Sequence, residues 1–466
     1  MIKKILLTLF VVIVAGQVFA QTSDNDYTRP LVDVLKKIET EFHVQIKYDS
    51  KLIAGKQLKY ADWRIQPWSV TKSLQAVLAP FDYTYVMDHG TYKIKPFDYT
   101  RMSDAEGKEF IDYLETLYNN KSSWEKRKDE LKSCMWQVLK LPALLSHQPK
   151  VRVILTPKRK YDDYTVENFA LETLPGLYVC GSIYMPSKIK GKYPVMLNPN
   201  GHFTDGRYRA DQQIRCAMEA RMGIIAADWD LFAWGESRLQ FNSALHRTSV
   251  AGSIQILNAI SVLNYLLSLK DIDTTRVGIT GGSNGGGTSI MVSALDNRIT
   301  LSIPVVMLTS HFAGGCPCES GLPIQLCGNR TNYAEIAAMF APKPQLVVSD
   351  GHDWTSTVPT LEFPFLQRTY GFYNAVNEVK NVHLPNEGHD YGPSKRKAMY
   401  EFTAAHWGLD INRIKDKAGN FDESKVTIEK DPKMYTFGPN GENLPANAIK
   451  GKVALTAMLT KIGYYK

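Results

Sequence analysis

The feature with the clearest chemical meaning is a serine inside a glycine cluster. Residues 276–292 read RVGITGGSNGGGTSIMV, an apolar segment followed by a G-x-S-x-G pattern around Ser283. This pattern forms the tight strand-to-helix turn that carries a nucleophilic serine, because side chains at the glycine positions would collide with strand and helix. A phosphate-binding loop is the competing interpretation, but the segment lacks the G-x-G-x-x-G spacing and has no Gly-Lys pair before Thr288. The sequence therefore predicts a serine nucleophile.

A nucleophilic serine needs a histidine to accept its proton and a carboxylate to orient that histidine. In folds that use this turn, the order along the chain is serine, acid, histidine. Of the ten histidines, His389 is the predicted base, because it follows a glycine at the end of the apolar segment in NVHLPNEGHDYG. His202 is the runner-up, but it precedes the serine.

The predicted acid is Asp353, in PQLVVSDGHDWT. Asp350 lies closer to the predicted strand, and the glycine-containing turn after it should present the later carboxylate to the site. Asp390 is adjacent to the base and should point away from it. Glu319, in HFAGGCPCESGLP, remains the alternative acid because it follows the preceding predicted strand.

The negative oxygen that develops on an attacked carbonyl needs two hydrogen-bond donors. A helix that begins directly after the serine would supply the backbone N–H of Asn284. The second donor should come from the loop after an earlier strand. The segment YPVMLNPNGHF places His202 and Phe203 in that loop, and either backbone amide could serve.

The candidate catalytic residues lie between short apolar segments, which alternate along the chain with helical patterns. This alternation predicts an α/β fold with a mostly parallel sheet covered by helices on both faces. Helices are expected over 208–219 and 252–268. The predicted strands lie in segments 176–186, 193–200, 223–230, 274–281, 302–308, 343–351 and 381–388.

The 466-residue chain is too long for one core, and its pattern divides it into several parts. Residues 28–98 read as a small βαβ domain with a hairpin turning at His89-Gly90, and this order resembles the secretin/TonB short N-terminal domain. The resemblance implies a possible periplasmic protein partner for this domain. The remaining parts are a signal peptide (1–20), a helical bridge (100–150), a catalytic domain (151–410) and a C-terminal tail (411–466) with a helix near 453–462.

The first twenty residues have two lysines, a short apolar run and a small residue at Ala20, which is typical of a cleaved secretory signal. We expect a periplasmic or secreted protein, with no transmembrane segment because no second apolar run approaches about 20 residues. The net charge is +8, and the lysines and arginines are dispersed among 47 acidic residues. The sequence therefore has no basic block of the kind that binds nucleic acid.

Across roughly residues 150–410 the chain resembles the acetyl xylan esterase-like and dienelactone hydrolase-like branch of the α/β-hydrolases. The segments that carry this likeness are NPNGHF, AADWDLFAWGES, GITGGSNGGG, GGCPCESG, VVSDGHDWT and LPNEGHDYGPSKR. The likeness implies a serine esterase that acts on an acylated carbohydrate through an acyl-serine intermediate, with no cofactor and no metal. Glucuronoyl esterases are similar, but they usually carry Arg where this chain has Asn284, and dienelactone hydrolases use a cysteine nucleophile.

Trp229, Phe232 and Trp234 follow a predicted strand, and they are expected either to stack on a sugar ring or to pack in the core. Among the six cysteines, Cys134, Cys180 and Cys216 lie in apolar stretches and should be buried free thiols. One disulfide is expected within the set Cys316, Cys318 and Cys327. A zinc site that uses His311 is a weaker idea.

Two other function classes compete with the esterase. A serine exopeptidase would use the same fold and triad, but such enzymes usually carry a propeller or a helical lid ahead of the catalytic domain. The roughly 130 residues available are too few for a propeller. A non-catalytic periplasmic binding or signalling protein would have lost its active residues, whereas this chain keeps a complete set of candidates.

Overall fold

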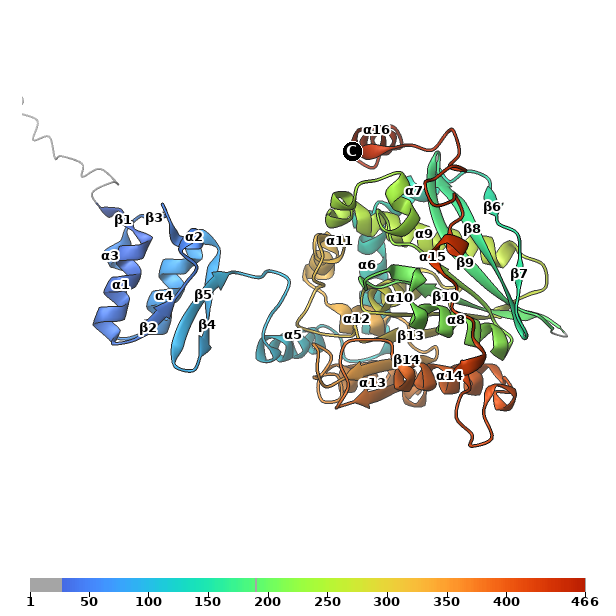
Figure 1. Cartoon of the computed structure of the whole chain (residues 1–466). Helices are drawn as coiled ribbons and strands as arrows, with labels where there is room; N and C mark the ends of the chain where they lie inside the picture. The colour runs from blue at the N-terminus through green and yellow to red at the C-terminus, as the bar shows by residue number, and fades with distance from the viewer. Residues whose placement is uncertain (1–26, 189–190, 466) are drawn as a thin grey trace, which may run out of the picture. The chain divides into compact units, whose positions relative to one another are not determined.

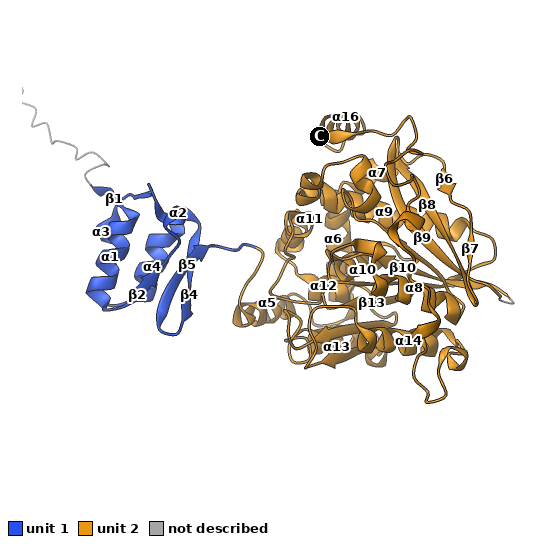
Figure 2. Ribbon diagram, in the orientation of Figure 1, with its two compact units in different colours: residues 1–99 blue, residues 100–466 orange. Residues whose placement is uncertain are grey.

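The computed structural model describes residues 27–188 and 191–465, and the predicted signal peptide lies outside these residues. The chain divides into two compact units, Met1–Tyr99 and Thr100–Lys466 (Figure 2). The boundary lies beside the predicted end of the small N-terminal domain. Residues 100–150, predicted as a bridge, belong to the second unit.

The first unit is a small α/β module with a three-stranded sheet. The strands lie in the order β2-β5-β4, with β2 parallel and β4 antiparallel to β5. As predicted, the β4–β5 hairpin turns at His89 and Gly90, both of which have positive φ. A two-stranded pair, β1 and β3, lies beside it. The elements are β1 (Arg29–Pro30), α1 (Leu31–Phe42), β2 (Gln45–Lys47), α2 (Ser50–Ile53), β3 (Gln57–Leu58), α3 (Ala61–Arg64), α4 (Val70–Leu78), β4 (Tyr83–Asp88) and β5 (Thr91–Pro96).

The second unit is built on a ten-stranded sheet (Figure 1). Its order is β15-β14-β13-β12-β10-β11-β9-β8-β6, and β7 pairs with β8. In this order, the strands from β15 to β11 are mutually parallel. Strand β9 is antiparallel to β11, β8 is antiparallel to β9, and β6 is antiparallel to β8. The strands are β6 (Val153–Leu155), β7 (Arg159–Lys160), β8 (Tyr164–Leu174), β9 (Leu177–Pro186), β10 (Tyr193–Pro199), β11 (Ile225–Trp229), β12 (Ile272–Gly282), β13 (Leu301–Val305), β14 (Gln345–Asp350) and β15 (Val379–Leu384).

All seven predicted strands are present, and the mostly parallel sheet is confirmed. The long strand β8, which forms a hairpin with β9, was not predicted. Its residues 168–174 are buried on both faces, so the segment lacks the strict alternation that marks a half-exposed strand.

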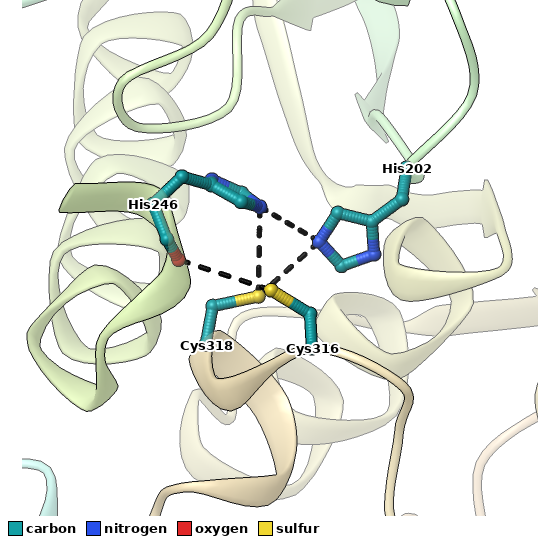
Figure 3. Close-up of side chains that lie close together, drawn as sticks. All are labelled: His202, His246, Cys316 and Cys318. Atoms are coloured by element: carbon teal, nitrogen blue, oxygen red, sulfur yellow. Dashed lines mark hydrogen bonds between the residues drawn. The ribbon is translucent and has the colours of Figure 1, made fainter. Parts of the chain in front are cut away.

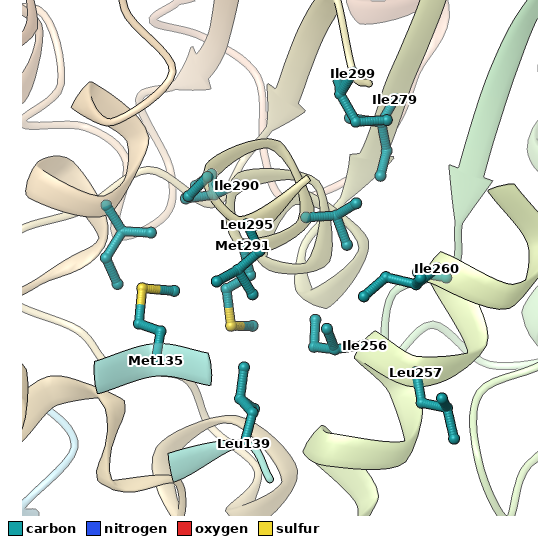
Figure 4. Close-up of a cluster of buried hydrophobic side chains, with 14 of the residues drawn as sticks. Met135, Leu139, Ile256, Leu257, Ile260, Ile279, Ile290, Met291, Leu295 and Ile299 are labelled. Atoms are coloured by element: carbon teal, nitrogen blue, oxygen red, sulfur yellow. The ribbon is translucent and has the colours of Figure 1, made fainter. Parts of the chain in front are cut away.

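Helices cover both faces of the sheet, as predicted, and consecutive strand residues point into different cores. Val195 and Leu197 of β10 belong to the larger core, and Met196 between them belongs to the smaller one. Figure 4 shows the larger core where α9 and α10 meet. The remaining helices of this unit are α5 (Asp104–Leu117), α6 (Lys121–Val138), α7 (Leu141–Leu145), α8 (Ala210–Met222), α9 (Ser249–Ser268), α10 (Asn284–Leu295), α11 (Pro317–Ser320), α12 (Tyr333–Ala338), α13 (Glu362–Gly371), α14 (Pro393–Trp407), α15 (Asp431–Met434) and α16 (Gly451–Lys461).

Helix α9 corrects the expectation that no second apolar run has membrane length. In the described part of the chain it is the one helix long and apolar enough to cross a membrane, and 89% of its most apolar window is buried inside the protein. Such burial is typical of a core helix, which needs an apolar surface all round.

A disulfide joins Cys134 of α6 to Cys327, with their Cα atoms 5.7 Å apart. The predictions of a free Cys134 and of a pair within Cys316, Cys318 and Cys327 are therefore wrong. Helix α6 packs against the 310 segment η6 (Pro323–Asn329), which brings the two cysteines together across 193 residues of sequence. Cys180 and Cys216 are buried free thiols, as predicted.

The C-terminal segment after α14 packs closely on the rest of the second unit. The buried side chains of Met434 and Phe437 anchor it. Glu429 forms an ion pair with Arg159 at 2.5 Å. Helix α16 spans nearly the same residues as the terminal helix predicted near 453–462.

Candidate active site

Ser283 occupies a strained turn between β12 and α10. Its φ of 56° and ψ of −128° are unusual for a residue with a side chain. A Cβ at Gly281 would meet the Gly285 carbonyl oxygen at 2.6 Å, and one at Gly285 would meet the Pro199 oxygen at 2.3 Å. The neighbouring backbones therefore require these two glycines. The Ser283 amide donates to the Val305 carbonyl at 3.1 Å, which fixes the turn against β13.

The predicted base and acid contact each other directly. His389 Nδ1 lies 2.6 Å from Asp353 Oδ2, and the Asp353 side chain is only 2% exposed. The other carboxylate oxygen of Asp353 accepts from the Thr355 amide at 2.6 Å and from the Thr355 hydroxyl at 2.5 Å. These bonds fix the carboxylate so that it accepts a hydrogen bond from Nδ1–H of His389, which leaves Nε2 free to act as a base.

The His389 ring lies beside the serine turn. It packs against Trp354, with ring centroids 4.3 Å apart, and against Phe203 at 5.7 Å. Trp354 lines the same cavity as Ser283. A Cβ at Gly282, next to the serine, would lie 3.3 Å from the Phe203 ring. Shared neighbours thus place the nucleophile and the predicted base in one site.

The two neighbouring aspartates, Asp350 and Asp390, face Lys395. Asp350 sits 3.6 Å from the Lys395 ammonium; burial, followed by the nearby Asp353 charge, raises the pKa of Asp350 to about 6. For Asp353, burial opposes ionisation, but the hydrogen bonds from His389 and Thr355 prevail and hold its pKa below the usual value. Asp353 is therefore the carboxylate that remains charged beside the histidine. Asp390 contacts Lys395 at 2.8 Å.

Glu319 is a poor candidate for the acid. Its carboxylate lies 3.7 Å from His202 Nδ1, on a different histidine from the predicted base. Burial raises the pKa of Glu319 to about 8. A carboxyl group that is protonated near neutral pH cannot stabilise an imidazolium.

The predicted oxyanion residues converge on the serine turn. Asn284 begins α10, and its side-chain amide lies 3.4 Å from His202 Nε2. The loop after β10 approaches closely at Gly201, where a Cβ would meet the Gly282 oxygen at 2.4 Å. The amides of His202 and Phe203 follow directly, so the loop lies where the second donor is needed.

The three aromatic residues at the end of β11 and after it have different environments. Trp229 and Phe232 are 2% and 1% exposed and belong to the larger core. Of the two roles expected for them, core packing is therefore the one observed, and stacking on a sugar ring is wrong. Trp234 is half-buried and lines the cavity with Ser283.

The cavity has a volume of about 320 Å³, and sequence analysis missed several of its residues. Exposed Arg101 and Arg247 line it, together with Phe312 and Trp354. Arg101 reaches the cavity because residues 100–102 pair with 311–313, and its guanidinium lies 4.5 Å from the Phe312 ring centre. No local pattern marks either arginine, because the contacts join segments far apart in sequence.

Four potential metal ligands gather at one side of this cavity: His202, His246, Cys316 and Cys318 (Figure 3). His311, the histidine considered for a zinc site, lies elsewhere. It contacts Thr309 at 3.2 Å and faces Glu362 at 3.7 Å.

Comparisons with known proteins give similarities to esterases. The model of the acetyl xylan esterase (AXE1) family matches residues 255–342. Acetyl esterase Axe7A of Xylanibacter ruminicola is 24% identical over 206 residues, which are 40% of this chain and 44% of that protein. The chain thus matches less than half the length of this curated relative.

Among solved structures, Methylesterase BT1017 is 51% identical, with 96% of this chain and 98% of that chain covered and a TM-score of 0.86. A glucuronoyl esterase from Teredinibacter turnerae is 15% identical, covering 67% of this chain and 93% of that chain with a TM-score of 0.49. At 51% identity over nearly the full length, the chain is an α/β-hydrolase that belongs to the same esterase family as Methylesterase BT1017.

Proposed function

We propose that the protein is an exported serine esterase that removes methyl groups from esterified uronic acids in carbohydrates. The observation that carries the proposal is the His389–Asp353 hydrogen bond of 2.6 Å beside a cavity that contains Ser283. The 51% identity to a methylesterase supports the type of ester. A methyl ester requires a carboxyl group, and the sugars that carry one are uronic acids.

The charges in the cavity support an acidic carbohydrate. Arg101 and Arg247 both line the wall near Ser283, where they can pair with free carboxylates on neighbouring sugar residues. Trp234 offers an aromatic face to a sugar ring. Asn284 stands where glucuronoyl esterases usually carry an arginine. A uronate substrate is still compatible with this chain, because Arg101 and Arg247 bring cationic side chains to the same cavity from other segments.

In the proposed mechanism, Ser283 Oγ attacks the ester carbonyl carbon while His389 Nε2 accepts its proton. The amides of Asn284 and of His202 or Phe203 donate to the resulting oxyanion. The tetrahedral intermediate collapses as its bond to the methoxy oxygen breaks and His389 protonates that oxygen, so that methanol leaves and a uronoyl-serine ester remains. Water then gives a proton to His389 and attacks this ester, and the histidine returns the proton to Ser283 as the uronic acid leaves.

A second candidate is hydrolysis of acetylated sugars, because the acetyl xylan esterase family model matches residues 255–342. There the acyl group on serine would be acetyl, and the sugar would be the leaving alcohol. The same three residues would carry out both reactions. The two candidates therefore differ in which side of the ester occupies the cavity.

A substrate panel tests the proposal. The full chain is incubated with a methyl-esterified oligouronate and with an acetylated neutral xylo-oligosaccharide, and released methanol and acetate are quantified. We expect methanol release to be faster, and Ser283→Ala to abolish both reactions. A chain that releases neither product would contradict an esterase, and faster acetate release would favour the second candidate.

Export and the N-terminal unit are parts of the same proposal. The Cys134–Cys327 disulfide supports an oxidising compartment, in agreement with the signal-like first twenty residues. The N-terminal unit is proposed to bind a periplasmic protein. Its Trp63 and Trp68 are 62% and 73% exposed, and exposed aromatic side chains often mark interaction surfaces.

A further inference from the structure

Two histidines and two cysteines from three segments converge beside the cavity. His202 follows β10, His246 lies in the 310 segment η5 (Ser243–Arg247), and Cys316 and Cys318 lie at the start of α11. Their ligand atoms all lie within 4.8 Å of one another (Figure 3). His246, Cys316 and Cys318 are buried, at 2%, 5% and 1% exposure. Convergence of four such side chains at one point needs a physical reason.

The separations agree with those around a tetrahedral metal ion. The two Nε2 atoms are 2.8 Å apart, and Cys318 Sγ lies 3.2 Å from His202 Nε2 and 3.7 Å from His246 Nε2. Bonds of about 2.0–2.1 Å to nitrogen and about 2.3 Å to sulfur place neighbouring ligand atoms roughly 3.3–3.8 Å apart. These three separations lie within about half an ångström of that range, and Cys316 Sγ lies within 4.8 Å of the other three ligand atoms.

The outer contacts of the histidines orient them for binding. His246 Nδ1 lies 2.7 Å from the Phe232 carbonyl, which can only accept, so Nδ1 carries the proton and Nε2 presents a lone pair to the cluster. His202 Nδ1 faces the Glu319 carboxyl at 3.7 Å. A carbonyl partner such as that of His246 fixes the ring orientation of a metal-binding histidine. The Nε2 atoms of the two histidines face each other at 2.8 Å, so either a shared proton or a metal ion can lie between them.

We propose that His202, His246, Cys316 and Cys318 bind one divalent ion of the zinc class. Two histidines and two thiolates form a donor set that zinc favours. On binding, each cysteine releases its thiol proton to solvent, and the two thiolate charges neutralise the ion in this buried place. A shared proton would satisfy the two histidines alone, but it leaves the convergence of both sulfurs unexplained.

Four protein ligands complete the coordination, so the ion is structural and does not bind substrate. It would tie the loop that carries His202 and Phe203 to α11 and to η5. The inference goes beyond the proposed esterase activity, which uses Ser283, His389 and Asp353 and could fail independently.

Cobalt binding tests the proposal with a readout that does not depend on activity. The full chain, purified without a metal-binding tag, is reduced, stripped with a chelator and titrated with Co²⁺ under anaerobic conditions. We expect one equivalent to bind, with the intense visible bands of a tetrahedral ion and sulfur-to-cobalt charge-transfer absorption. Zn²⁺ should displace it and should raise the unfolding temperature of the stripped protein.

Variants assign the ligands. Cys316→Ser and Cys318→Ser should each weaken the charge-transfer absorption and lower Co²⁺ affinity by at least tenfold. Cys180→Ser, which changes a buried free cysteine elsewhere, is the matched control and should bind one equivalent. Should the ligand variants fail to fold, the titration of the reduced wild-type chain still decides. Binding of less than about a tenth of an equivalent by that chain, or tetrahedral bands without charge transfer, would overturn the proposal.

Discussion

The Asp353 carboxylate hydrogen-bonds His389 Nδ1 at 2.6 Å, whereas Asp350, three residues earlier, faces the Lys395 ammonium at 3.6 Å. Strand β14 ends at Asp350, and the turn that follows carries the later carboxylate to the histidine. The two acids are three positions apart but have different partners. Neutralising Asp353 and neutralising Asp350 should therefore have different effects on activity.

Asp353→Asn should lower kcat by about 10³-fold or more. The Thr355 donors would hold the new Oδ1, so Nδ2–H would face His389 Nδ1 and force the proton onto Nε2, the wrong tautomer for a base. Steady-state kinetics on a small ester measures the effect. Asp350→Asn is the matched control and should lose less than about tenfold; equal losses would contradict the assignment of the acid.

Arg101→Gln and Arg247→Gln should impair acidic substrates selectively. Each removes a cation from the cavity wall, and a charge-assisted hydrogen bond is worth about 1.5–3 kcal/mol, or about ten- to a hundredfold in binding. We expect KM for a methyl-esterified oligouronate to rise accordingly. The kcat/KM for a small neutral acetate ester should stay within about twofold. A parallel loss on the neutral ester would indicate general damage to the site.

Removing the Cys134–Cys327 bond should destabilise the second unit by about 2–4 kcal/mol. The bond closes a long loop and links α6 to η6, which constrains the unfolded chain. Urea unfolding of the Cys134→Ser/Cys327→Ser double variant measures the loss. Reduced wild-type protein should behave like the variant, and an unchanged unfolding midpoint in both samples would show that the bond contributes no stability.

Glu219 should make stability depend on pH. Burial raises its pKa to about 8, although Arg215 and the hydrogen bond from Asn198 favour the charged form. The folded protein then holds this proton more tightly than the unfolded chain, so the free energy of unfolding falls as pH rises from about 5 to about 8. Glu219→Gln should remove a decline on the order of a few kcal/mol, seen by urea unfolding at both pH values. A variant with the same decline as wild type would contradict this account.

Local sequence patterns were enough to predict strands β9 to β15 and to select Ser283, Asp353 and His389 as the candidate triad. Glycines at 281 and 285 fit a place where backbones approach closely, and Asp353 and His389 lie in the loops that follow β14 and β15. Residues of this kind carry their signal within a few positions.

Apart from strand β8, whose continuous burial removes the alternating pattern of a half-exposed strand, the features that sequence reasoning missed depend on contacts between distant segments. Arg101 reaches the cavity through pairing with residues 311–313, and Cys134 meets Cys327 across 193 positions. Likewise, His202 and His246 meet the two cysteines of α11 only in the folded chain. The prediction for the aromatic residues of segment 229–234 was partly wrong for a related reason. The sequence pattern alone does not distinguish the buried Phe232 from Trp234, which lines the cavity.

Labelling with a fluorophosphonate, followed by peptide mass mapping, tests most directly whether Ser283 is the nucleophile. The account predicts a single adduct on Ser283 in the wild-type chain, no adduct in Ser283→Ala and much slower labelling of His389→Ala. Full labelling of Ser283→Ala, or an adduct on another residue of the wild-type chain, would contradict it.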